Sequence, residues 1–140
     1  MMAKKDVLKL QHSYKCAPEK LFDAWLDPAV VREFMCPGAT HVSRLEWQAK
    51  VGAQFHLDMT EGAETVAHRG RFLEIDRPKR LVFTWSSEYA GEDSRVTLEF
   101  EAQQDRTRLT LTHERLPSKK AIEMHTQGWS AILDKLAAIS

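Results

Sequence analysis

Three histidines lie where the sequence pattern places side chains on an apolar face. His12 falls in an alternating segment at residues 8–14, His113 ends another at 109–113, and His125 lies on the apolar stripe of a C-terminal helical segment. An imidazole titrates near neutral pH, so each of them could transfer a proton or fix the polar end of a ligand. Each could equally be a buried structural histidine, bonded to the backbone or to a neighbouring side chain.

His113 and His125 form the strongest pair for acid–base chemistry. The last predicted strand leads directly into the C-terminal helix, so the ends of these two elements can lie close together. We therefore treat both histidines as candidate catalytic residues. No convincing nucleophile accompanies them, because the sequence has neither a GxSxG motif nor a glycine-rich phosphate loop.

Metal binding is not favoured by the spacing of the potential ligands. The sequence contains no HxH, HxxxH or Cys/His cluster. We therefore expect no metal site and no cofactor. The carboxylate pairs Glu61/Glu64 and Glu92/Asp93 fall in predicted turns, where we expect them to be solvated.

Aromatic and aliphatic side chains on the same faces could form the wall of a ligand pocket, or could simply be core. Trp85 and Trp129 could stack on a ligand. Gly128 lies inside a helical segment, where glycine costs about 1 kcal/mol relative to alanine, and this suggests either close contact with the sheet or room for a ligand. The candidate ligand-binding residues are therefore His12, Phe55, Leu57, Met59, Phe72, Phe83, Trp85, Val96, Leu98, His113, His125, Gly128, Trp129 and Ile132.

The element that must position much of this set is a long helix over residues 116–140. Its apolar residues recur at gaps of three and four, which places them on one face. Pro117 and Ser118 supply a stop and an N-cap before the helix. The apolar stripe consists of Ile122, His125, Trp129, Ile132, Leu136 and Ile139.

Between residues 8 and 113 the sequence alternates mainly between short strands and turns. Two short helices after the first strand, at 19–26 and 28–35, each begin near a proline. Gly70, within a predicted strand, indicates a bulge or a close backbone approach. A polar loop is expected at 86–93. The predicted strands are 8–14, 41–47, 53–59, 66–75, 81–85, 96–100 and 109–113.

These elements predict a single α+β domain over residues 1–140, in which a curved antiparallel sheet of six to seven strands surrounds one long C-terminal helix. The chain has 20 basic and 20 acidic residues and a formal net charge of zero. This balance argues against nucleic acid or an anionic membrane as the main partner, since both favour a concentrated basic patch.

Membrane insertion and secretion are not predicted either. No apolar run approaches the roughly 20 residues of a membrane helix, and residues 1–6 are polar. Cys16 and Cys36 have no CxxC spacing, so we expect reduced thiols in a cytoplasmic protein. The sequence leaves open whether the protein is a monomer or a homodimer.

Several short motifs occur in a characteristic order along the chain: 17–25 (APEKLFDAW) with Asp27-Pro28, the Val51-Gly52 turn, 70–75 (GRFLEI), 80–85 (RLVFTW), 107–113 (TRLTLTH), and His125, Gly128, Trp129 and Leu133. With these motifs the sequence resembles the family of proteins similar to the activator of the heat shock protein 90 ATPase, within the START/birch-pollen-allergen (SRPBCC) superfamily. It departs from the usual pattern of that family at residues 33–35 (EFM), where a Trp-rich pair is common, and at 51–53 (VGA), where two glycines are usual.

The resemblance implies the helix-grip (START-like) fold, with two short helices closing one end and a pocket between the C-terminal helix and the sheet. Three functions follow as hypotheses. The first is binding of a small apolar or amphipathic molecule, oriented by His113, His125 and His12. The second is stimulation of the chaperone ATPase, although relatives of the activator usually carry an additional N-terminal domain. The third is cofactor-free cyclase, dehydratase or hydrolase chemistry that uses His113 or His125 as the acid–base group.

Overall fold

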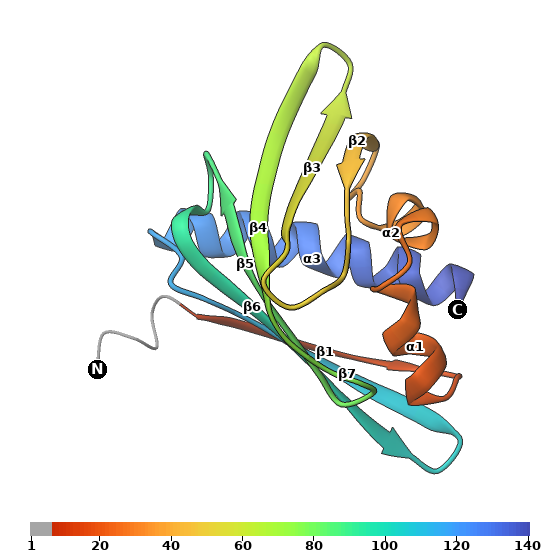
Figure 1. Ribbon diagram of the computed structural model, residues 1–140. Helices are drawn as coiled ribbons and strands as arrows, with labels where there is room; N and C mark the ends of the chain where they lie inside the picture. The colour runs from red at the N-terminus through yellow and green to blue at the C-terminus, as the bar shows by residue number, and fades with distance from the viewer. Residues whose placement is uncertain (1–6) are drawn as a thin grey trace.

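A long helix lies across one face of a seven-stranded sheet in the computed structural model, which describes residues 7–140 (Figure 1). Figure 1 shows the two short helices near the C-terminal end of the long one. The elements in chain order are β1 (Leu8–Tyr14), α1 (Pro18–Ala24), α2 (Pro28–Phe34), β2 (His41–Glu46), β3 (Gln54–Glu61), β4 (Glu64–Asp76), β5 (Arg80–Ser87), β6 (Gly91–Gln103), β7 (Arg106–Glu114) and α3 (Lys119–Ile139).

The sheet is antiparallel throughout, with strand order β1-β7-β6-β5-β4-β3-β2. Strands β2 to β7 form a meander, and β1 completes the sheet beside β7. This arrangement confirms the predicted α+β helix-grip architecture. The polar segment at residues 1–6 lies outside the described residues. Within residues 7–140, no helix is both long and apolar enough to span a membrane.

Helix α3 forms where the sequence predicts it, and its start is defined by a cap. The Ser118 side chain accepts a hydrogen bond from the Ala121 amide at 3.1 Å, which satisfies one of the unpaired N–H groups of the first turn. The apolar stripe packs onto the sheet, and the Tyr14 hydroxyl on β1 donates to the Leu133 carbonyl at 2.9 Å. Ile139 was expected on the buried stripe but is 43% exposed, because the helix ends there.

Gly70 permits a close approach between three strands. Gly70 on β4 is paired with Phe55 on β3, and a Cβ atom at Gly70 would collide with the Phe55 ring and with the Thr84 carbonyl oxygen of β5. A register shift between Phe72 and Glu74 lies just beyond it. Both features that glycine indicates within a strand, a close approach and a bulge, are therefore found in this region.

The hairpin between β5 and β6 is longer than expected, and the predicted loop at 86–93 is wrong. The ladder continues to the pair Ser87 and Gly91, so the turn contains only residues 88–90. The Ser87 hydroxyl accepts from the amides of Tyr89 and Ala90, which allows this polar sequence to turn tightly. As a result, Ser87 and Tyr89 reach the end of the sheet that α3 covers.

Candidate ligand-binding site

A cavity of about 230 Å³ lies between α3 and the strands β3, β4 and β5. Its wall is mostly apolar, with two tryptophans from different elements. The ring centroids of Trp85 on β5 and Trp129 on α3 are 5.1 Å apart. Of the candidate residues, the cavity wall includes Met59, Trp85, His125, Gly128, Trp129 and Ile132.

The other candidates are elsewhere. The residues Phe55, Leu57, Phe72, Phe83, Val96 and Leu98 pack in the core and do not line this cavity.

His12 is far from the cavity in the strand order, because β1 is an edge strand and the cavity lies over β3 to β5. Its Nε2 lies 3.3 Å from the Asp134 carboxylate, and its ring stacks on Tyr14 with centroids 4.5 Å apart. The alternation in the sequence placed this side chain correctly on the face that α3 covers. It is not among the residues that line the cavity.

Gly128 leaves open space at the cavity wall. A Cβ atom at this position would have Pro37 Cγ as its nearest neighbour, at 4.0 Å, which is ordinary van der Waals contact. Of the two explanations for a glycine in this helix, the structure therefore favours room at the site over a close contact with the sheet. A larger side chain at Gly128 would project into the cavity.

The rim of the cavity includes two carboxylates that the sequence analysis assigned to a solvated turn. Glu61 and Glu64 are the last residue pair of the β3–β4 ladder, and both are exposed. Both nevertheless line the cavity, together with the exposed side chains of Tyr89 and Met124. Sequence alone could not find this, because it depends on how far each hairpin extends along α3.

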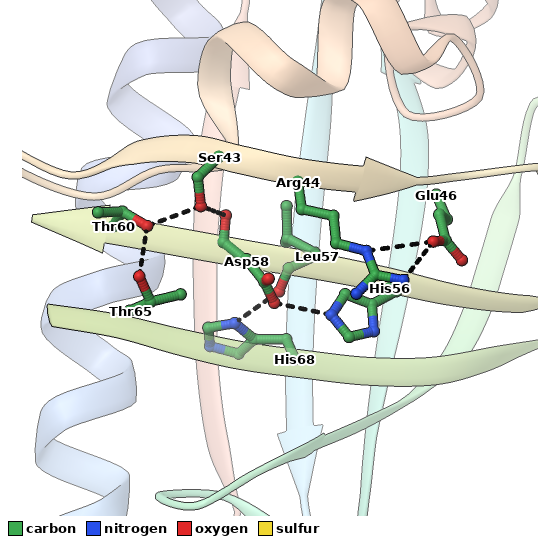
Figure 2. Close-up of polar contacts among 9 residues, drawn as sticks. All are labelled: Ser43, Arg44, Glu46, His56, Leu57, Asp58, Thr60, Thr65 and His68. Carbon is green, nitrogen blue, oxygen red and sulfur yellow. Dashed lines mark hydrogen bonds and ion pairs between the residues drawn. The ribbon is translucent and has the colours of Figure 1, made fainter.

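His68 is a site residue that the sequence analysis missed, although a signal was present. It alternates with Val66, Gly70 and Phe72, which predicts an inward side chain. In the structure it is 7% exposed, lines the cavity, and packs on Trp85 with centroids 4.8 Å apart. Its Nδ1 lies 3.2 Å from the Leu57 carbonyl oxygen (Figure 2).

His113 is fully buried and belongs to a hydrogen-bonded chain of defined direction. The Trp129 Nε1–H can only donate, and it donates to His113 Nδ1 at 3.0 Å. His113 Nε2 must then carry the ring proton and donate to the Ser94 hydroxyl at 2.8 Å, and that hydroxyl donates to the Trp85 carbonyl. Both ring nitrogens are therefore committed, and His113 acts by holding the two tryptophans that line the cavity.

His125 faces His113, as the sequence analysis expected, with ring centroids 5.0 Å apart. Its Nδ1 lies 2.7 Å from the Ala121 carbonyl oxygen. Because a carbonyl only accepts, this nitrogen carries the proton, and Nε2 keeps its lone pair in the neutral ring. His68 is in the same state, since its Nδ1 also faces a carbonyl.

Burial makes His68, His113 and His125 poor bases. It lowers the pKa of His113 to about 3, with a further contribution from His125, and it lowers the pKa of His68 to about 4. Burial also lowers the pKa of His125, partly opposed by the Ala121 carbonyl. At neutral pH all three rings are uncharged, so His68 and His125 offer hydrogen-bond acceptors to the cavity.

The opposite face of the same strands carries a separate polar network. Figure 2 shows Arg44 bound to Glu46, and His56 Nε2 lies 2.8 Å from the Asp58 carboxylate. His56 and Asp58 alternate with the inward residues of β3, so they face away from the cavity, and Arg44 and Glu46 lie beside them on β2. Among residues 7–140, no group of three or more His, Cys, Asp or Glu side chains has the arrangement of a metal site.

The family described as "Activator of Hsp90 ATPase homolog 1-like protein" matches residues 15–140. No curated protein matches the chain. Protein CV1439 from Chromobacterium violaceum has a similar structure, with a TM-score of 0.89, 23% identity and 96% of each chain covered. The AHSA1 protein SPO3351 from Silicibacter pomeroyi is 26% identical, with a TM-score of 0.83 and 94% and 95% of the two chains covered.

Protein Ms6760 from Mycobacterium smegmatis has the same fold, with a TM-score of 0.83 and 16% identity, over 98% of this chain and 92% of that one. These similarities agree with the helix-grip fold described above. The family match covers nearly the whole chain and includes every element that forms the cavity. The protein therefore belongs to the Activator of Hsp90 ATPase homolog 1-like family.

Proposed function

We propose that this protein binds a small apolar or amphipathic molecule in the cavity between α3 and strands β3 to β5. The observation that carries the proposal is the cavity itself. Sites for small molecules are typically concave and mostly apolar, with a few polar groups that orient the ligand. Here an apolar space of about 230 Å³ is lined by Trp85 and Trp129 and adjoins a helix glycine that packing does not require.

The size and position of the cavity limit the ligand. Its volume is below the roughly 300–1,000 Å³ of pockets for drug-sized molecules. It therefore suits a compact molecule, or one end of a longer molecule whose remainder passes Tyr89 and Met124 at the rim. An aromatic or short aliphatic body would fill the space between the tryptophans and gain free energy by leaving water.

Catalysis is supported less well than binding. The commitment of both nitrogens of His113 leaves His125 as the candidate acid–base residue, through its Nε2. Its lowered pKa makes it a weak base at neutral pH. Stimulation of the heat shock protein 90 ATPase remains a prediction from the family resemblance. Cytoplasmic location remains a prediction from the cysteine pattern, and the sequence leaves open whether the protein is a monomer or a homodimer.

Filling the cavity from Gly128 tests the proposal. We expect the wild-type protein to bind 2-phenylethanol, measured by isothermal titration calorimetry, and Gly128→Leu to weaken binding at least about tenfold, because the new side chain occupies the ligand's space. The fold should persist, since leucine is the better helix former by nearly 1 kcal/mol.

A control variant separates this effect from a general change in α3. Gln127→Leu adds the same side chain at the neighbouring exposed position, outside the cavity lining, and should bind as the wild type does. Equal binding by wild type and Gly128→Leu, or no measurable binding by the wild type, would contradict a ligand site in this cavity.

A further inference from the structure

We infer that the ligand is amphipathic with a positively charged end, an organic ammonium group that lies at the rim near Glu61 and Glu64. This inference rests on the proposed function and names the class of ligand. It depends on three properties of the cavity: the sign of its charged groups, the direction of its hydrogen bonds and the aromatic faces in its wall.

The charged side chains that line the cavity are of one sign. Among residues 7–140, Glu61 and Glu64 are in the lining, and no lysine or arginine accompanies them there. Neither carboxylate forms an ion pair with another described side chain. The whole chain has equal numbers of acidic and basic residues, so the acidic rim is a local property. It favours a cation and opposes an anion at this position.

Most hydrogen-bond donors of the wall are bound within the protein or enclosed by it. His68 and His125 each direct Nδ1–H at a backbone carbonyl, and the Thr40 hydroxyl donates to the Pro37 carbonyl at 2.6 Å. The indole N–H of Trp129 is bound to His113, whereas that of Trp85 has no hydrogen-bond partner but is enclosed by protein atoms and out of a ligand's reach.

The hydrogen-bonding groups of the wall that remain available to a ligand are mainly acceptors. His68 and His125 each keep a lone pair on Nε2, because the Nδ1 of the neutral ring carries the proton. The Tyr89 hydroxyl can accept as well as donate, whereas the Ser87 hydroxyl already accepts from the amides of Tyr89 and Ala90. A ligand that brings several N–H donors satisfies these acceptors, whereas a carboxylate brings none.

Aromatic faces in the wall favour the same ligand. Trp85 packs against both Trp129 and His68, with centroids 5.1 and 4.8 Å away, and Tyr89 lies at the rim. A cation near the face of a tryptophan or tyrosine is attracted by the ring quadrupole, and the same rings hold an apolar body. The wall therefore suits both ends of an organic amine.

Three probes with the same aromatic body and different charge test the inference. We would titrate 2-phenylethylamine, which is an ammonium ion near neutral pH, 2-phenylethanol and phenylacetate in a low-salt buffer, by calorimetry. We expect the amine to bind about fivefold tighter than the alcohol, and phenylacetate to bind most weakly. Higher salt should weaken the amine selectively, because the rim carboxylates are exposed and screened.

The double variant Glu61→Gln/Glu64→Gln should reduce the affinity for the amine about fivefold and leave that for the alcohol within a factor of about two. The control Glu99→Gln/Glu101→Gln changes the net charge equally at exposed positions of β6 outside the cavity, and should change neither affinity. Amine binding no tighter than that of the alcohol, or unaffected by the rim variant, would overturn the inference while the cavity proposal stands. Failure of all three probes to bind would contradict both.

Discussion

Gly70→Ala is expected to lower the free energy of unfolding by about 3 kcal/mol, measured by urea denaturation. The added methyl group would meet the Phe55 ring and the Thr84 carbonyl oxygen. The ring is held in an aromatic cluster with Trp47, Phe72 and Phe83, and the carbonyl is fixed by the chain path of β5, so neither can move without disturbing the core. Because Phe55 packs on Trp85, the distortion should extend to the cavity wall.

Gly128→Ala is the matched control, since it makes the same change at the other glycine that lies inside a regular element. Its new methyl group would meet no atom closer than 4.0 Å. It should therefore raise the free energy of unfolding by up to about 1 kcal/mol, through helix propensity alone. A Gly70→Ala protein within 1 kcal/mol of the wild type would show that the strands do not approach as closely as described.

Acid is expected to weaken the fold in a pH range where most carboxylates are still ionised. His68 and His113 are neutral in the folded protein, with pKa values lowered to about 4 and about 3. In the unfolded chain each takes up a proton below about pH 6.5. Their contribution to stability is thus complete above pH 6.5, and it is lost as the pH falls toward the folded pKa values.

Between pH 7 and pH 5, each of these two histidines should lower the free energy of unfolding by about 2 kcal/mol. The two together should lower it by about 4 kcal/mol, which can be measured by denaturation at each pH. His125 adds to this loss in the same direction, because its pKa is also lowered. His68→Gln should remove about half of the loss, whatever its effect on stability at neutral pH. Equal free energies of unfolding at pH 5 and pH 7 would contradict the burial of His68 and His113 as uncharged rings.

The fold could be predicted from local patterns because each pattern has one physical cause. Ser118 caps α3, and the three- and four-residue spacing of Trp129, Ile132 and Leu136 places these side chains on one face of a helix. The alternation of β7 similarly predicted which side chains face α3. Only the end of the β5–β6 hairpin, residues 86–93, differs from the expected loop. Its residues are polar, and polarity does not prevent ladder hydrogen bonds at an exposed end.

The candidate site was predictable only in part. One face of α3 carries four of the cavity residues, and their spacing along the helix was enough to group them. They are His125, Gly128, Trp129 and Ile132. Alternation on a strand gives the face of a residue but not its position across the sheet, and this is why His12 was included although β1 is remote from the cavity.

Two further kinds of information were beyond the sequence. Trp129 and Ser94 take both nitrogens of His113, and no pattern in the sequence predicts which partners a buried ring finds. Glu61 and Glu64 reach the rim because the β3–β4 hairpin extends to it, which depends on tertiary packing.

The indole N–H signals of the four tryptophans offer the most direct test of ligand binding in the cavity. Trp85 and Trp129 line it, whereas Trp25 and Trp47 are buried elsewhere in the core. Titration of the 15N-labelled protein with 2-phenylethylamine, followed by two-dimensional NMR with signals assigned from single Trp→Phe variants, should shift the Trp85 and Trp129 signals in a saturable way. The Trp25 and Trp47 signals should stay nearly in place. Four unchanged signals, or equal shifts at all four, would contradict a ligand site between α3 and the sheet.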